Sequence, residues 1–140
     1  MTPIVLIVGA PASGKSTASR ALAAKFPKSI AICVDDLREM VVSGLALPAA
    51  EWSDPLVEQL RLARSSAVAM AKTYHAAGYA VVIDDFYDPF TQMSEYDALL
   101  GSGALTRVVL YPDPQKAHAQ NRKRSGSGQS PDYLDEGIRI

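Results

Sequence analysis

An apolar run near the N-terminus leads directly into a turn bounded by glycines and then into an alanine-rich segment. Residues 3–8 consist only of proline, isoleucine, valine and leucine, which is typical of a strand buried on both faces of a parallel sheet. Residues 15–26 are rich in alanine and stop before Pro27, so they predict a helix. A strand that turns at once into a helix is a building unit of α/β folds.

The rest of the chain repeats this alternation of strand and helix signals. Apolar runs predict further strands at residues 29–34, 79–83 and 106–111. Helical spacing predicts a long helix that begins at Asp54, as the cap, with Pro55 and ends at Gly78. Shorter helices are predicted at residues 37–42, 89–100 and 113–122. We therefore expect a three-layer α/β sandwich with a mainly parallel sheet of four or five strands, in one domain spanning residues 1–140.

Composition narrows the function classes. The chain is 48% hydrophobic and 21% charged, which is typical of a folded globular domain. Its net charge of -1 gives no overall field that would attract nucleic acid or an anionic membrane, so any anion site must be local.

Its one cysteine, Cys33, cannot form an intrachain disulfide and is expected in the core. The apolar run at residues 4–8 is too short for a membrane span or signal peptide, which favours a cytoplasmic protein.

The glycine-bounded turn carries the most specific motif. Residues 9–16 match the phosphate-binding pattern G-x-x-x-x-G-K-[ST] at every fixed position, between a predicted strand and a predicted helix. Loop N–H groups and the helix N-terminus attract phosphate oxygens. The motif predicts an ATP and Mg²⁺ site built from Gly9, Ala12, Ser13, Gly14, Lys15, Ser16 and Thr17. Lys15 would reach the β- and γ-phosphates, and the Ser16 hydroxyl would bind magnesium. The alternative is a tight strand–helix turn without a ligand.

Two carboxylates, Asp84 and Asp85, follow the third predicted strand. An acidic residue at such a strand end can hold Mg²⁺ or its water shell, as a Walker B aspartate does. The pattern does not distinguish the two residues, and capping or turn formation is the alternative for both.

A second acidic pair, Asp35 and Asp36, follows the second predicted strand, with Arg38 one helical turn later. A carboxylate there faces the γ-phosphate and can accept the proton of an attacking hydroxyl. Arg38 can hold an anionic group on the acceptor by a forked contact. The alternative is that the aspartates cap a helix and Arg38 lies in solvent. A guanine-reading N-K-x-D element is absent from the sequence, which argues against a GTPase.

With these motifs the sequence resembles the small P-loop phosphotransferases, most closely the kinase domain of phage-type polynucleotide 5′-hydroxyl kinases. The shared features are the loop at residues 9–17, Asp35-Asp36-x-Arg38, a strand ending at Asp85, and Asn121-x-Lys123-Arg124. The resemblance implies that Asp35 is the general base and that Arg38 grips a phosphate of the acceptor. It also implies a lid around residues 120–130, in which Arg124 stabilises the leaving phosphates and Arg122 is a second candidate. Phe86 and Tyr87 depart from the small polar residues that the family tends to have after Asp85.

Three functions remain open at this point. The first is an ATP-dependent kinase of a nucleic-acid hydroxyl, most simply a 5′ end. The second is a kinase of a small molecule such as a nucleoside or sugar, which the mildly acidic net charge fits equally well. The third is an ATP-binding module that transfers nothing. Asp35 and Arg38 favour the first two, because a pure switch needs no base for an acceptor.

Overall fold

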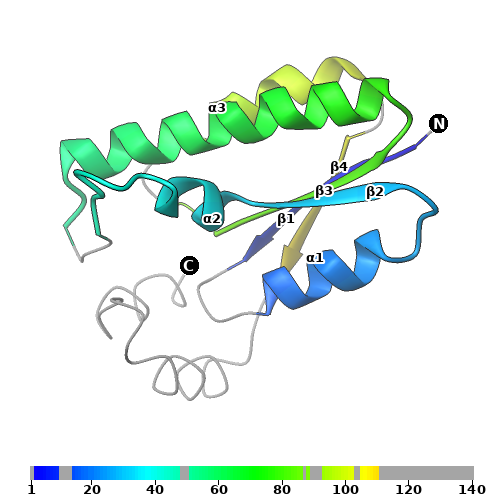
Figure 1. Cartoon of the computed structure of the whole chain (residues 1–140), viewed down its shortest axis with the longest axis horizontal. Helices are drawn as coiled ribbons and strands as arrows, with labels where there is room; N and C mark the ends of the chain where they lie inside the picture. Colours follow the sequence, from blue (N-terminus) through cyan, green and yellow to red (C-terminus); the bar gives the residue numbers. More distant parts are fainter. Residues whose placement is uncertain are drawn as a thin grey trace.

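In the computed structural model, the parts of the chain that are described are residues 2–9, 14–47, 51–86, 88, 93–102 and 105–110. The strands in these parts form one sheet in the order β2-β3-β1-β4 (Figure 1). β1 (Ile4–Gly9) pairs with β3 (Ala80–Phe86) and with β4 (Leu105–Leu110), and β2 (Ser29–Cys33) pairs with β3. Every pairing is parallel, so the carboxyl ends of all these strands meet at one edge of the sheet. This is the edge at which open α/β sheets bind ligands.

Helices cover both faces of the sheet. Figure 1 shows α1 (Lys15–Ala23) on one side, and α3 (Asp54–Ala76) with the 3₁₀ helix η1 (Ser94–Ser102) on the other. The short helix α2 (Val34–Glu39) continues directly from β2 and packs against α3. This arrangement confirms the predicted three-layer α/β sandwich with a parallel sheet.

The alternation of side chains along β1 explains why two separate cores form. Every residue of β1 and β3 is buried, as expected for inner strands of a parallel sheet. The core on the α3 side contains Ile4, Leu6, Val8, Val81, Ile83, Ala63, Ala67, Tyr96 and Leu99, among others. The core on the α1 side contains Val5, Ile7, Val82 and Ala23. Successive strand residues therefore point into opposite layers of the sandwich. The same alternation separates the side chains of Asp84 and Asp85 at the carboxyl end of β3.

The long helix α3 begins and ends close to the predicted positions. Its N-cap is Ser53 rather than the predicted Asp54, because the Ser53 hydroxyl accepts a hydrogen bond from the backbone N–H of Leu56 at 3.2 Å. Asp54 instead lies in the first turn, where the helix dipole favours an acidic side chain. Gly78, with φ 90°, follows the helix as predicted and adopts the left-handed conformation that favours glycine. No helix in the described part of the chain is both long and apolar enough to cross a membrane.

Several other predicted boundaries differ from the structure. α2 starts at Val34 rather than residue 37, so Asp35 and Asp36 lie in its first turn, where acidic side chains are stabilised. β3 continues to Phe86 rather than ending at residue 83, because Asp84 and Asp85 find partners inside the protein. A helix passing through residue 93 is excluded because Met93 has φ 52°. The predicted helix at residues 113–122 and the predicted lid lie outside the described residues.

Candidate active site

The phosphate-loop motif joins β1 to α1. β1 ends at Gly9, and Gly14 is the N-cap of α1 with φ 84°, a left-handed conformation in which glycine is unstrained. α1 has no side-chain cap and no acidic residue in its first turn, whereas the first turn of α2 holds two aspartates. The N-terminus of α1 therefore presents backbone N–H groups and a positive dipole end to an anion. Lys15 is its first, half-buried residue, while Ala12 and Ser13 lie outside the described residues.

Asp84 lies against α1. Its Oδ1 accepts a hydrogen bond from the Ser16 hydroxyl at 3.3 Å, and its Oδ2 accepts one from the Ser19 hydroxyl at 3.0 Å. Asp84 is only 1% exposed, whereas Ser16 is exposed. A hydroxyl and a carboxylate are the hard oxygen donors that Mg²⁺ prefers, with water and substrate phosphates completing its shell. The two residues at this position therefore fit the ion that the sequence predicts.

A cleft of about 330 Å³ opens beside this pair. It is lined by Ser16, Thr17, Ser19, Arg20, Ala31, Cys33, Asp36 and Asp84. Cys33 was expected in the core, yet it is only partly buried and its Sγ lies 3.9 Å from the Ser16 Oγ. Burial raises the pKa of this thiol to about 11, and the nearby charge of Asp84 adds to the rise. The cleft is thus lined by polar side chains from four elements, α1, β2, α2 and β3.

Asp35 and Arg38 lie on α2, next to this site. Asp35 is half-buried and Asp36 is exposed on the rim of the cleft. Arg38 is only 6% exposed, and its Nη1 donates a hydrogen bond to the Ala46 carbonyl at 2.7 Å. The interpretation of Arg38 as a solvated surface residue is therefore wrong. In this structure the guanidinium holds the segment between α2 and α3.

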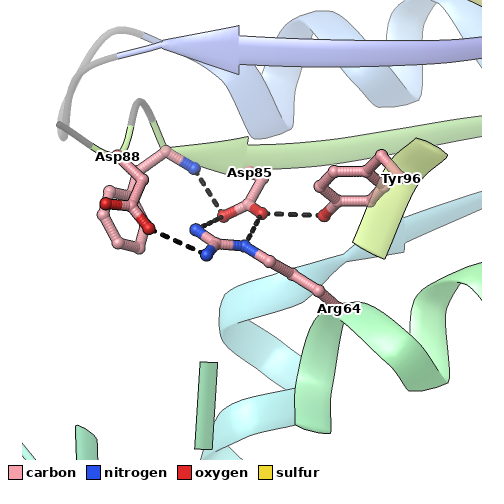
Figure 2. Close-up of polar contacts among 5 residues, drawn as sticks. Arg64, Asp85, Asp88 and Tyr96 are labelled. Atoms are coloured by element: carbon pink, nitrogen blue, oxygen red, sulfur yellow. Dashed lines mark hydrogen bonds and ion pairs between the residues drawn. The ribbon is translucent and has the colours of Figure 1, made fainter. Parts of the chain in front are cut away.

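Asp85 faces away from the cleft and lies in a buried polar network (Figure 2). Arg64 of α3 donates from Nε to Asp85 Oδ2 at 2.7 Å and from Nη1 to Asp88 Oδ2 at 2.8 Å. The Tyr96 hydroxyl donates to Asp85 Oδ2 at 2.7 Å, and the Phe86 backbone N–H donates to Asp85 Oδ1 at 2.8 Å. The network ties together α3, η1, the end of β3 and the segment that follows it.

The electrostatics of the network favour one protonation state. Burial opposes the charge of Arg64, but the carboxylates of Asp85 and Asp88 raise its pKa above the ordinary value. Burial also raises the pKa of Asp85, and the Arg64 guanidinium opposes that rise. Burial and the neighbouring Asp85 raise the pKa of Tyr96. Arg64 thus remains a cation and Tyr96 a neutral hydrogen-bond donor.

The structure separates two residues that the sequence left equivalent. It brings Asp84 together with Ser16, and it places Asp85 on the opposite face of β3 with Arg64. Adjacent strand residues point to opposite faces of a sheet, so both cannot reach the same side. The two lid candidates, Arg122 and Arg124, lie outside the described residues.

Sequence reasoning missed Ser19 and Arg64. A signal existed for each of them. Ser19 lies three residues after Ser16, which places both on one side of α1. Arg64 lies four residues after Leu60 and three before Ala67, on the apolar stripe that α3 turns toward the sheet. A charged residue on such a stripe indicates a buried ion pair.

Comparison with known proteins identifies the family and the fold of the chain. Residues 4–138 match the AAA domain family AAA_33, whereas a comparison with curated proteins finds no match. A chain in the structure of the Pnkp1/Rnl/Hen1 RNA repair complex is similar, with TM-score 0.63, 21% identity, and coverage of 99% of this chain and 43% of that chain. This chain therefore spans less than half of the RNA repair chain.

Two small kinases are also similar. A sugar kinase from Janibacter sp. HTCC2649 has TM-score 0.69 and 16% identity, over 99% of this chain and 77% of that one. Shikimate kinase from Acinetobacter baumannii has TM-score 0.65 and 17% identity, over 100% of this chain and 76% of that one. These likenesses show the fold, and the family match covers nearly the whole chain. The protein therefore belongs to the AAA domain family AAA_33, a P-loop kinase family, as its sequence motifs predicted.

Proposed function

We propose that the protein transfers the γ-phosphate of ATP to a hydroxyl group. The observation that carries this proposal is the contact between Ser16 of the phosphate-loop motif and the buried carboxylate of Asp84. A turn that served only to connect a strand to a helix would not need a hydroxyl and a carboxylate at magnesium-ligand positions. Asp35, which lies in the first turn of α2 just after β2, supplies the acid–base group that transfer requires.

The roles of the residues follow from the chemistry of phosphoryl transfer. The acceptor oxygen bonds to the γ-phosphorus while the bond to the β–γ bridging oxygen breaks, and Asp35 takes the acceptor proton. Lys15 and the N-terminus of α1 bind the phosphates, and Ser16 and Asp84 hold the magnesium. When bound, magnesium neutralises charge on the β- and γ-phosphates. Arg124, with Arg122 as a second candidate, would stabilise the leaving phosphates from the lid.

For the acceptor we propose a hydroxyl borne by nucleic acid, most simply a 5′ end. The resemblance at Asp35-Asp36-x-Arg38 and the likeness to a chain of an RNA repair complex support this choice. In this role Arg38 binds the phosphate next to the attacked hydroxyl. It would exchange its bond to the Ala46 carbonyl for that phosphate.

The burial and internal hydrogen bond of Arg38 also favour a second candidate acceptor, a small-molecule alcohol. Arg38 is only 6% exposed and its guanidinium is bonded to the chain itself, so it is poorly placed to meet a bulky polymer. The similar sugar kinase and shikimate kinase act on compact alcohols, as their names state. Such an acceptor could enter without opening the segment that Arg38 holds.

A transfer assay tests the proposal. The protein is incubated with γ-labelled ATP, Mg²⁺ and a panel of 5′-hydroxyl oligonucleotides, matching nucleosides, and sugars. Asp35→Asn should abolish most labelling, with kcat lower by about 10²-fold or more. The matched control is Asp36→Asn, which removes the same charge from the exposed neighbouring position and should retain activity.

The outcomes separate the three functions. Label on the oligonucleotide but not on its nucleoside supports a nucleic-acid acceptor and a phosphate contact by Arg38. Label on a nucleoside or sugar at least as efficiently assigns the protein to the small-molecule kinases. ATP binding with no labelled product across the panel leaves the ATP-binding module and contradicts the proposed transfer.

A further inference from the structure

Ser19 lies next to Ser16 and Asp84. It belongs to α1 and is 1% exposed. Its hydroxyl lies 3.0 Å from Asp84 Oδ2 and 2.9 Å from the Ser16 carbonyl oxygen. A serine hydroxyl has one hydrogen, which these two acceptors share. The same side chain therefore contacts both residues to which magnesium binding is assigned.

The two oxygens of Asp84 have different surroundings. Oδ1 faces the hydroxyl of Ser16, while Oδ2 is held by the hydroxyl of Ser19. A hydrogen bond to Oδ2 restricts rotation of the carboxylate and keeps Oδ1 directed toward Ser16.

The charge of Asp84 also lacks a basic partner in the described part of the chain. Its neighbour Asp85 is paired with Arg64 at 2.7 Å, whereas no lysine or arginine of the described residues forms an ion pair with Asp84. A buried carboxylate without an opposite charge is costly unless a cation or several donors compensate it. Ser19 supplies a donor, and the remaining charge suits a bound cation.

We propose that Ser19 is a positioning residue that orients Asp84 for the magnesium ion bound with ATP. This inference rests on the proposed function, because it assumes that Ser16 and Asp84 hold magnesium. Groups that orient a metal ligand commonly change metal affinity by 10- to 100-fold when they are removed. Ser19 should therefore act on the magnesium dependence of ATP binding rather than on ATP binding itself.

Calorimetry of ATP binding with and without Mg²⁺ measures this effect without any turnover. In the wild type, Mg²⁺ should strengthen ATP binding. In Ser19→Ala that enhancement should fall by about 10-fold, while binding of ATP without metal is unchanged. Alanine is the stronger helix former and removes only the hydroxyl. Ser19→Thr keeps the hydroxyl and should restore the enhancement.

A matched control is Ser66→Ala. Ser66 is an exposed helical serine of α3 whose hydroxyl donates to the Leu62 carbonyl at 2.8 Å, away from the site. This variant should retain the full magnesium enhancement. Asp84→Asn should lose the enhancement whether or not Ser19 is present, because the carboxylate is the group on which Ser19 acts.

Each result has one meaning. If Mg²⁺ does not strengthen ATP binding in the wild type, the proposed metal site itself fails. If the wild type responds to Mg²⁺ and Ser19→Ala responds equally, the positioning role is overturned while the proposed function stands. An equal loss of ATP affinity with and without Mg²⁺ in Ser19→Ala overturns it too, because Ser19 would then support only the shape of the loop and helix.

Discussion

Asp84 and Asp85 are neighbours in β3, yet they lie in different chemical environments. Asp84 meets two serine hydroxyls from α1, and Asp85 meets the guanidinium of Arg64 from α3. The difference arises because consecutive strand residues point to opposite faces of the sheet. One carboxylate is left for a cation near the phosphate loop, while the other is already neutralised inside the protein.

The thiol of Cys33 should react slowly with alkylating agents. Burial raises its pKa from 9.0 to about 11, so the thiolate fraction near neutral pH falls about 100-fold. We expect alkylation of the folded protein at pH 8 to be about 100-fold slower than in urea. The rate should rise with pH toward a midpoint near 11. A midpoint near that of an ordinary thiol would contradict the burial argument. The single cysteine makes the labelled site unambiguous.

The same pKa has a consequence for stability. The folded state holds the thiol proton more tightly than the unfolded state, so this contribution is complete below about pH 9 and is lost as the pH rises toward 11. The difference in unfolding free energy between the wild type and Cys33→Ser should therefore decrease over that window.

At the scale of elements, the polar network of Arg64 joins α3 to the end of β3. Arg64, Asp85 and Tyr96 are at most 1% exposed, and Asp88 is 5% exposed. Buried ion pairs add little net stability, but losing one partner is strongly destabilising. Such a network therefore specifies one arrangement of α3, η1 and β3, and it fixes Asp88 just after β3.

Removing single groups from this network should lower stability in a defined order. Arg64→Met leaves two buried carboxylates without their cation and should cost about 3–5 kcal/mol. Tyr96→Phe removes one hydrogen bond to a charged group and should cost about 1.5–3 kcal/mol. Urea unfolding monitored by circular dichroism measures both.

Tyr74→Phe is the control for the tyrosine variant. Tyr74 is 37% exposed and its ring packs on Tyr79, so the change should be nearly neutral. Equal losses for Tyr96→Phe and Tyr74→Phe would mean that the hydroxyl of Tyr96 contributes nothing to the network.

Across the whole molecule, the candidate site and the main stabilising contacts lie on opposite faces of the sheet. The α1 face carries Ser16, Ser19 and Asp84, and the α3 face carries the buried network and the larger core. Because all described strands are parallel, the carboxyl ends of β1, β2 and β3 lie at the same edge of the sheet. The phosphate-loop motif, Asp84 and the start of α2, which holds Asp35, therefore lie at the same edge of the sheet although they are far apart in the sequence.

Binding of MgATP should stabilise the entire fold. At a concentration of about 100 times its Kd, a ligand that binds only the native state adds about 2.7 kcal/mol, which thermal unfolding detects as a higher Tm. Lys15→Ala should unfold at the wild-type Tm without nucleotide and lose most of the increase with it. An undiminished increase would show that Lys15 does not bind the phosphates.

The proposed lid makes a kinetic prediction for the full chain. Arg124→Ala should lower kcat more than it raises the KM for ATP, because the charge that the arginine meets grows during transfer. Steady-state kinetics of this variant, with Lys123→Ala as the neighbouring control, measures the split. A change in KM alone would mark ordinary ground-state binding.

The sequence by itself determined the class of fold, most of the element order in the described residues and the phosphate-loop motif. These features depend on short-range periodicity and on residues within one turn of each other, as in residues 9–16. Only the tertiary structure decided that Asp84 rather than Asp85 meets Ser16, that Arg64 is buried, and that Arg38 binds the Ala46 carbonyl. The Asp84 and Arg64 contacts join residues 68 and 21 positions apart, so they depend on which face each strand residue presents and which helix packs there. Local patterns carry no record of that packing.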